Sequence, residues 1–211
     1  MKKKKDNQRL NAKLDLRRHF LRRYPPRSVF DACCGEGVVW SQLRGEFPRL
    51  RYWGVDKKRR PGRLAIDSIR ILSQPGWDFD VVDVDTYGSP WEHWLAILPR
   101  VRAPLTVFLT WGLGMRGTAS NHSNTFISAL GLRFSRDLPR RLLNTAVNAT
   151  WERVLWRAVD HGLHIVEAQE MVTAGVQATA RYLGIRLELQ AAPESEAALD
   201  AARKETHELL S

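Results

Sequence analysis

Hydrophobic positions recur along the chain with two different spacings. In residues 10–23 they fall at helical spacing, and Leu10, Leu14, Phe20 and Leu21 are expected to face inward from a basic amphipathic helix. Short apolar runs that end at turn residues are instead typical of buried strands. Such runs occupy residues 28–32, 51–55, 63–66, 79–85 and 104–110. Helical or turn segments separate them, so the pattern predicts a parallel α/β sheet.

The second half of the chain has a different pattern. Residues 111–137 are rich in Gly, Ser, Thr and Asn, which predicts a long loop that is either functional or disordered. A long helix is expected over 139–161, and the runs 164–172 and 180–189 predict an antiparallel hairpin. Together the elements predict an α/β fold: a Rossmann-like domain with a seven-stranded, mostly parallel sheet, an antiparallel C-terminal hairpin and helices on both faces.

We expect this domain to span residues 28–190, after a basic N-terminal arm and helix (1–27) and before a helical tail (191–211). No apolar run has the length that a bilayer requires, and no apolar segment follows the basic start, so neither a membrane span nor secretion is expected. The two cysteines, Cys33 and Cys34, are neighbours that pair poorly, which favours a reduced, cytoplasmic setting.

The net charge of +10 favours a polyanionic partner, because basic surfaces attract phosphates. The basic residues gather in separate clusters at 2–5, 17–18, 22–23, 57–60 and 136–141. A nucleic acid is therefore an expected partner, with a basic protein that has no such partner as the alternative. The scattered histidines show no spacing typical of zinc, so no metal is expected.

The segment Asp31-Ala-Cys-Cys-Gly-Glu-Gly37 follows the first predicted strand, where doubly wound folds bind their ligands. Gly35 and Gly37 permit a sharp turn and a close backbone approach to a ligand. Asp31 can accept a hydrogen bond from an ammonium group. S-adenosylmethionine, which carries an ammonium and a sulfonium, suits this acidic loop better than a pyrophosphate does. A plain strand-to-helix turn is an equal alternative for the glycines alone.

Further aspartates end the next strands. Asp56 follows the glycines at the spacing from which an acid binds ribose hydroxyls. Asp67 can reach an adenine amino group, although a helix N-cap explains it as well. Asp85 ends the fourth strand. Strand-end carboxylates at one edge would repel one another, and a cationic ligand would offset that repulsion.

The segment Asp85-Thr-Tyr-Gly-Ser-Pro90 completes a series that resembles the motifs of class I S-adenosylmethionine-dependent methyltransferases over residues 28–190. It is similar to the Asp-Pro-Tyr-Gly-Ser-Pro element of the tRNA guanine N2-dimethyltransferases. The resemblance implies that Asp85 orients the target amine and that Tyr87 stacks on the base, both as catalytic residues. A turn residue is the alternative for Tyr87. The resemblance to the methyltransferases further implies S-adenosylmethionine as the cofactor. The residues that would bind it are Asp31, Cys33, Gly35, Glu36, Gly37, Asp56, Asp67 and Asp85.

The sequence departs from the family pattern at two positions, with Thr86 in place of Pro and Cys33 in place of the first loop Gly. The guanine N2 enzymes also carry a C-terminal domain that has no counterpart here, so substrate recognition is expected to come from the N-terminal helix, the loop 111–137 or an accessory partner protein. The aromatic content is compatible with a homodimer, and the oligomeric state is left open. Near the motif, His93 is expected on a helix surface, with a position that lines the target pocket as the alternative. Trp91 and Trp94 are expected in core or lid packing.

The resulting hypothesis is methyl transfer to an exocyclic amine of a nucleobase, with RNA, for example tRNA, favoured over DNA. Two alternatives remain open. One is a methyltransferase that acts on a small-molecule or protein amine. The other is a catalytically silent module that binds nucleic acid with the same fold.

Overall fold

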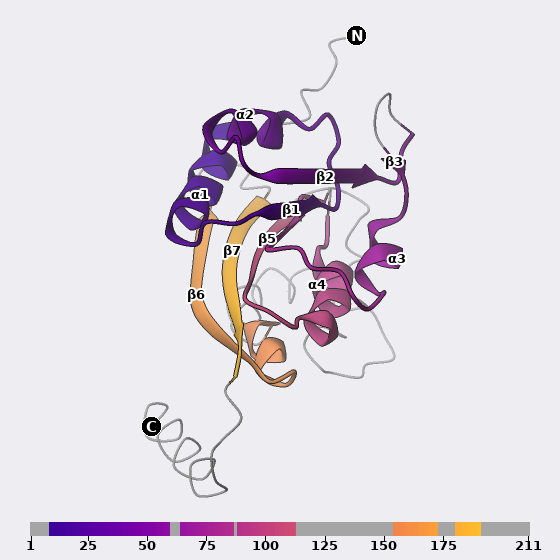
Figure 1. The fold of residues 1–211 in the computed structure, drawn as a ribbon, viewed down its shortest axis with the longest axis vertical. Coiled ribbons are helices and arrows are strands. Elements are labelled where there is room, and N and C mark those ends of the chain that lie inside the picture. Colours follow the sequence, from indigo (N-terminus) through magenta and orange to yellow (C-terminus); the bar gives the residue numbers. More distant parts are fainter. Residues whose placement is uncertain (1–8, 60–63, 87, 113–153, 173–179, 191–211) are drawn as a thin grey trace, which may run out of the picture.

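The computed structural model describes residues 9–59, 64–86, 88–112, 154–172 and 180–190. Within these residues seven strands form one sheet, in the order β3-β2-β1-β4-β5-β7-β6 (Figure 1). In chain order the strands are β1 (Ser28–Asp31), β2 (Arg51–Asp56), β3 (Leu64–Ala65), β4 (Val81–Val84), β5 (Leu105–Gly112), β6 (Leu163–Val172) and β7 (Ala180–Leu189).

The centre of the sheet is parallel and its C-terminal part is antiparallel. β1 pairs in parallel with β2 and with β4, and β4 pairs in parallel with β5. β7 runs antiparallel to both β5 and β6. The predicted fold class is therefore confirmed. Because β1, β2 and β4 run in the same direction, they all end at one edge, which we call the carboxyl edge, and the strand order reverses between β1 and β4.

Helices cover both faces of the sheet (Figure 1). On one face lie α1 (Leu10–Arg23) and α2 (Val38–Glu46), and on the other lie α3 (Ser68–Leu72), α4 (Trp91–Ile97) and the 3-10 turn η1 (Leu98–Arg100). Residues 154–159 are helical and join the second face. Each face has its own buried apolar cluster, which removes both sides of the central strands from water.

The bounds of several elements agree with the sequence pattern. α1 and β7 begin and end at the predicted residues, and β6 begins one residue earlier than predicted. The third strand is shorter, with only two residues, because it pairs with β2 alone at the border of the sheet. Of the predicted helix 139–161, residues 154–159 are helical, and the rest up to residue 153 lies outside the described residues.

The basic arm (1–8), the tail (191–211) and most of the predicted loop 111–137 also lie outside the described residues; residues 111 and 112 belong to β5. None of the helices in the described part has the length and apolar character that crossing a membrane requires.

The face of α1 that packs on the sheet contains the predicted apolar residues and also two basic residues that were not predicted there. Leu14, Phe20 and Leu21 are buried, as the apolar pattern predicts. Lys13 and Arg17 are buried as well, which the pattern did not predict. They lie one helical turn apart, and each meets a carboxylate at the end of β4. α1 is thus attached to the sheet by charges as well as by apolar packing.

Candidate functional site

The loop between β1 and α2 has the sharp turn that its glycines predict. Gly35 and Gly37 have φ angles of 50° and 70°, in the left-handed region that favours glycine. The Gly37 N–H donates to the Cys34 carbonyl at 2.6 Å, and α2 begins at the next residue. Two other predicted site residues lie on this loop, Cys33 half-buried and Glu36 exposed.

Asp56, at the end of β2, is joined directly to this loop. Its Oδ2 accepts from the Gly35 N–H at 3.0 Å, and its Oδ1 accepts from the Lys58 N–H at 2.8 Å. The Cys34 N–H donates to the Val55 carbonyl at 2.9 Å, which ties the loop to the same strand. The structure thus places the predicted ribose-binding acid beside the predicted glycine loop.

Asp31 ends β1 and is buried below the loop. Its Oδ2 accepts from the Tyr52 hydroxyl at 2.9 Å. Burial raises the pKa of Asp31 well above its usual range, and the nearby charge of Asp83 acts in the same direction, while the Tyr52 hydrogen bond opposes both. Asp31 therefore favours its neutral form more than an exposed aspartate does.

Asp83 lies opposite Asp31 in the register of β1 and β4. Arg17 of α1 donates to both of its carboxylate oxygens, from Nε at 2.7 Å and from Nη2 at 2.6 Å. The Trp40 indole of α2 donates to Oδ2 at 2.6 Å. Both Arg17 and Asp83 are almost fully buried, so this carboxylate is part of the attachment of the two helices to the sheet.

Asp85 follows β4 at the carboxyl edge and is half-buried. The Lys13 ammonium of α1 donates to its Oδ2 at 2.5 Å. Burial alone raises the pKa of Asp85, but the positive charges of Lys13 and Arg17 outweigh it, so the pKa lies below its ordinary value. Asp85 is therefore a carboxylate at neutral pH. It can accept hydrogen bonds but is a weak proton acceptor.

These contacts change the expected charge balance. The sequence predicts that carboxylates at the strand ends need a cationic ligand to offset their repulsion. In the structure Lys13 and Arg17 supply two of those positive charges from within the chain. The signal that could have revealed them is a pair of acids, Asp83 and Asp85, in and just after a strand that must be buried, together with basic residues one turn apart on an adjacent helix.

Asp67 is a helix N-cap in the structure, which is the alternative that the sequence offered to adenine binding. Its side chain accepts from the Ile69 N–H at 3.1 Å and so caps α3. The Lys57 ammonium lies 3.0 Å from its Oδ2. Burial raises the pKa of Asp67, but the Lys57 and Ile69 contacts outweigh this effect and lower it. Asp67 sits at the carboxyl edge, yet its carboxylate is already engaged with other groups.

His93 is buried in the structure, which corrects the expectation of a helix-surface position. It faces α3, and its Nε2 lies 2.9 Å from the Ser68 hydroxyl and 3.9 Å from the Cys33 sulfur. Burial lowers the pKa of His93 to about 4, so it is neutral at physiological pH. Trp91 and Trp94 on the same helix are fully buried, which confirms core packing.

The turn after β4 is fastened to β5. The Thr86 hydroxyl donates to the Thr110 carbonyl at 3.2 Å, and the Gly112 N–H donates to the Gly88 carbonyl at 2.8 Å. The hydroxyl of Thr86 thus supplies a contact that the family's proline lacks. Tyr87, the predicted stacking residue, lies outside the described residues.

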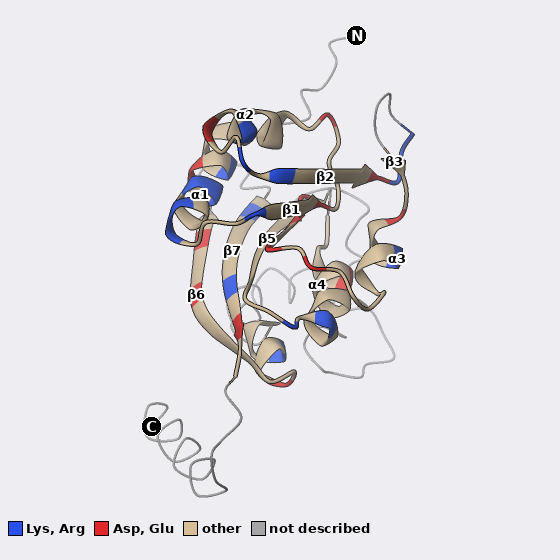
Figure 2. Ribbon diagram, viewed as in Figure 1, with Lys and Arg blue, Asp and Glu red and all other residues tan. Residues whose placement is uncertain are grey.

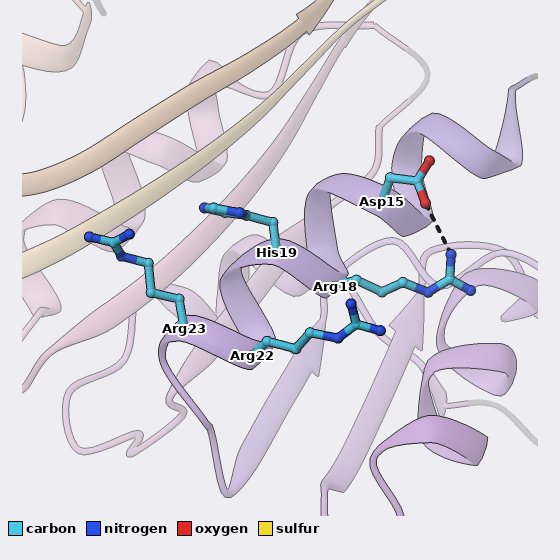
Figure 3. Close-up of a pocket in the computed structure, with 5 residues that line it drawn as sticks. All are labelled: Asp15, Arg18, His19, Arg22 and Arg23. Carbon is cyan, nitrogen blue, oxygen red and sulfur yellow. Dashed lines mark hydrogen bonds and ion pairs between the residues drawn. The ribbon is translucent and has the colours of Figure 1, made fainter.

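A separate feature lies on the outer side of α1. Arg22 and Arg23 line an open depression there, together with Asp15, Arg18 and His19 (Figure 3). None of the five is a predicted site residue. Because α1 ends at Arg23, shortly before β1 begins, this end of the helix lies toward the edge opposite the carboxyl edge. The depression is therefore distinct from the candidate site.

No protein-family model and no curated protein matches the chain. Solved structures do resemble it. Trm1 from Pyrococcus horikoshii, in complex with S-adenosyl-L-methionine, has a TM-score of 0.57 at 16% identity, over 86% of this chain and 55% of that one. TYW2 from M. jannaschii, in complex with AdoMet, has a TM-score of 0.53 at 9% identity, over 88% of this chain and 79% of that one.

A third similar structure is the plantazolicin methyltransferase BamL with a triazolic desmethylPZN analog and SAH, at a TM-score of 0.51 and 12% identity over 85% of this chain and 84% of that one. At these identities the likeness shows a shared fold. The chain spans about half the length of Trm1. The fold that the chain shares with these structures is that of the class I methyltransferases, which the sequence motifs predicted.

Proposed function

We propose that this chain is an S-adenosylmethionine-dependent methyltransferase whose acceptor is an exocyclic amine of a nucleobase in RNA. The observation that carries the proposal is the contact between the Gly35 N–H and the Asp56 carboxylate. It joins a glycine turn after β1 to an acid at the end of β2, and Asp31 and Asp85 lie at the same edge.

The chemistry of these groups fits the cofactor. S-adenosylmethionine brings two cationic groups, a ribose with vicinal hydroxyls and an adenine ring, and it supplies an activated methyl group. Asp56 would hold the ribose hydroxyls, and the loop from Asp31 to Gly37 would hold the methionine part. The neutral, buried His93 and the Asp67 cap flank the region near β3 where the ring would be placed.

The state of Asp85 supports an amine acceptor. A carboxylate whose pKa is lowered stays ionised and accepts a hydrogen bond from an N–H group. It thereby directs the nitrogen lone pair toward the methyl group and stabilises the positive charge that develops on nitrogen. The same low pKa makes proton removal by Asp85 before transfer unfavourable, so the acid acts by orientation and electrostatics.

The distribution of charge supports an RNA partner. The net charge is +10, and exposed basic residues follow the end of β2 directly at the carboxyl edge, among them Lys58 and Arg59 (Figure 2). Phosphates that approach the edge would meet these cations. An uncharged small-molecule acceptor would gain no attraction from them.

The test is methyl transfer from labelled S-adenosylmethionine to RNA, DNA, protein and amine metabolites in parallel. We expect label in RNA, and we expect Asp85→Asn to lose transfer while it still binds S-adenosylhomocysteine in calorimetry. Label in protein or metabolites alone would exclude the nucleobase acceptor. Cofactor binding without transfer to any acceptor would favour the silent binding module.

A further inference from the structure

The ammonium of Lys13 occupies a defined position beside Asp85. Its Nζ lies 2.5 Å from Asp85 Oδ2, and the two side chains are 7% and 20% exposed. The same Nζ lies 5.4 Å from the centre of the Tyr182 ring. A carboxylate and an aromatic ring face are both groups that stabilise a cation. Lys13 therefore fills a cation site at the carboxyl edge.

A neighbouring contact fixes Lys13 in this place. Arg17, one turn further along α1, holds Asp83 through two hydrogen bonds and donates from Nη1 to the Lys13 carbonyl at 3.0 Å. Because that guanidinium is buried and bidentate, α1 has little freedom to move away from β4. The Lys13 ammonium is thus part of the site's fixed architecture.

Its charge has a consequence for the acceptor. An alkylamine is protonated at neutral pH, so it would arrive as a second ammonium ion beside Lys13 and Arg17. Two like charges a few ångströms apart in a partly buried site repel strongly. Displacing Lys13 instead would leave a buried ammonium without its carboxylate, which is also unfavourable.

A neutral amine meets neither obstacle. The exocyclic amine of a nucleobase carries no charge at neutral pH. A carboxylate has about four lone-pair positions, so Asp85 can accept from such an N–H while Lys13 keeps its contact. The pair of Lys13 and Asp85 therefore discriminates between two classes of acceptor that both present nitrogen.

We propose that Lys13 is a specificity-determining residue, whose ammonium fills the cation position at Asp85 and so restricts the methyl acceptor to neutral amines. This inference rests on the proposed function. This role of Lys13 differs from a merely structural one, because a structural ion pair would make no distinction between charged and neutral acceptors.

The first experiment measures cation binding beside Asp85 through thermal stability, and it requires no methyl transfer. Lys13→Ala empties the position, and ethylammonium chloride should refill it. We expect ethylammonium to raise the Tm of Lys13→Ala by several degrees over potassium chloride of equal concentration, with no such effect on the wild type. The double variant Lys13→Ala with Asp85→Asn should lose the effect. Equal shifts in wild type and Lys13→Ala, or no shift in either, would overturn the proposal.

The second experiment measures acceptor specificity as the ratio of methyl label in an alkylamine to that in RNA. Lys13→Met keeps the length of the side chain and removes its charge, so it serves where Lys13→Ala does not fold. With labelled cofactor, RNA and n-butylamine compete as acceptors. Butylammonium must lose a proton before its nitrogen can attack the methyl group, and Asp85 can take that proton more readily in Lys13→Met, because the Lys13 charge that lowers its pKa is gone. We therefore expect the ratio of alkylamine to RNA label to rise at least about tenfold in Lys13→Met. An unchanged ratio would contradict the role of Lys13.

Failure of the proposed function has a different signature. A wild-type protein that does not bind S-adenosylhomocysteine in calorimetry would remove the methyltransferase assignment. The ethylammonium measurement on Lys13→Ala would still report whether the position beside Asp85 is a cation site.

Discussion

Arg17 of α1 and Asp83 of β4 form a bidentate ion pair in the interior of the protein, 66 residues apart in sequence, with N–O distances of 2.7 and 2.6 Å. The Trp40 indole completes the carboxylate's hydrogen bonds. The pair fixes the N-terminal helix over the sheet and thereby places Lys13 at Asp85. The position of Lys13 beside Asp85 thus depends on a contact at Asp83, two residues before Asp85 in the sequence.

Removing one member of this pair should be costly. Arg17→Met leaves Asp83 buried without its cation, and we expect the free energy of unfolding to fall by about 3 to 5 kcal/mol. Denaturant unfolding measures this. The double variant Arg17→Met with Asp83→Leu removes both charges and should recover part of the loss. A loss of under about 1 kcal/mol in Arg17→Met, the size typical of an exposed pair, would contradict the buried pair described here.

Asp31 should make stability depend on pH. Burial and the nearby Asp83 raise its pKa in the folded protein, so above the unfolded pKa of about 4 the folded state binds more protons than the unfolded state. This contribution to stability is fully present below that pKa and is lost as the pH rises through the folded pKa, by up to about 1.4 kcal/mol per pH unit.

Asp31→Asn tests this effect, because the amide keeps an oxygen for the Tyr52 hydroxyl but cannot ionise. The difference in unfolding free energy between Asp31→Asn and wild type should increase with pH over that window. A difference that is constant with pH, or one that shrinks as the pH rises, would show that folding does not raise the pKa of Asp31.

The packing of α1 against β7 leaves no room for a side chain at Gly184. A Cβ there would lie 2.5 Å from the Phe20 ring, which is itself fully buried. We expect Gly184→Ala to lose about 1 to 3 kcal/mol of stability through overpacking. Gly45→Ala is the matched control: nothing lies within 4 Å of its Cβ, and α2 should gain about 0.5 to 1 kcal/mol. Both values come from denaturant unfolding, and equal effects of the two changes would argue against the close packing of Phe20.

The two ends of β2 offer a matched test of RNA binding. Lys58 and Arg59 follow its end at the carboxyl edge, and Arg49 and Arg51 lie at its start. All four are exposed, so reversing either pair to Glu changes the net charge equally. We expect Lys58→Glu with Arg59→Glu to weaken RNA binding more, and to flatten its dependence on salt, in a filter-binding titration. Equal losses would indicate attraction by net charge alone.

The sequence predicts the fold well where periodicity is strong. α1 and β7 have the predicted bounds because each carries a repeating apolar pattern over at least ten residues. The glycine loop and Asp56 are also found together, since strand-end residues of a parallel sheet meet at one edge. Asp67 shows where strand-end position alone does not decide a residue's role. The sequence fits both a ligand-binding acid after a strand and the N-cap of a following helix, and the structure has the N-cap.

The contacts of the polar groups could not be predicted from periodicity. Lys13 and Arg17 count as polar positions on α1, and only the tertiary arrangement shows that they face buried acids. His93 likewise lies between two tryptophans on a helix too short for a clear periodicity, and its burial depends on α3 packing against α4. Such contacts depend on three-dimensional pairing between distant segments, which the periodicity of either segment alone does not predict.

Calorimetric titration with S-adenosylhomocysteine shows whether the carboxyl edge binds the cofactor. We predict saturable binding by the wild type, a loss of about tenfold or more in affinity for Asp56→Asn, and no change for Asp78→Asn, an exposed acid before β4. Absence of binding to the wild type, or equal affinities for Asp56→Asn and Asp78→Asn, would contradict the assignment of this edge as the cofactor site.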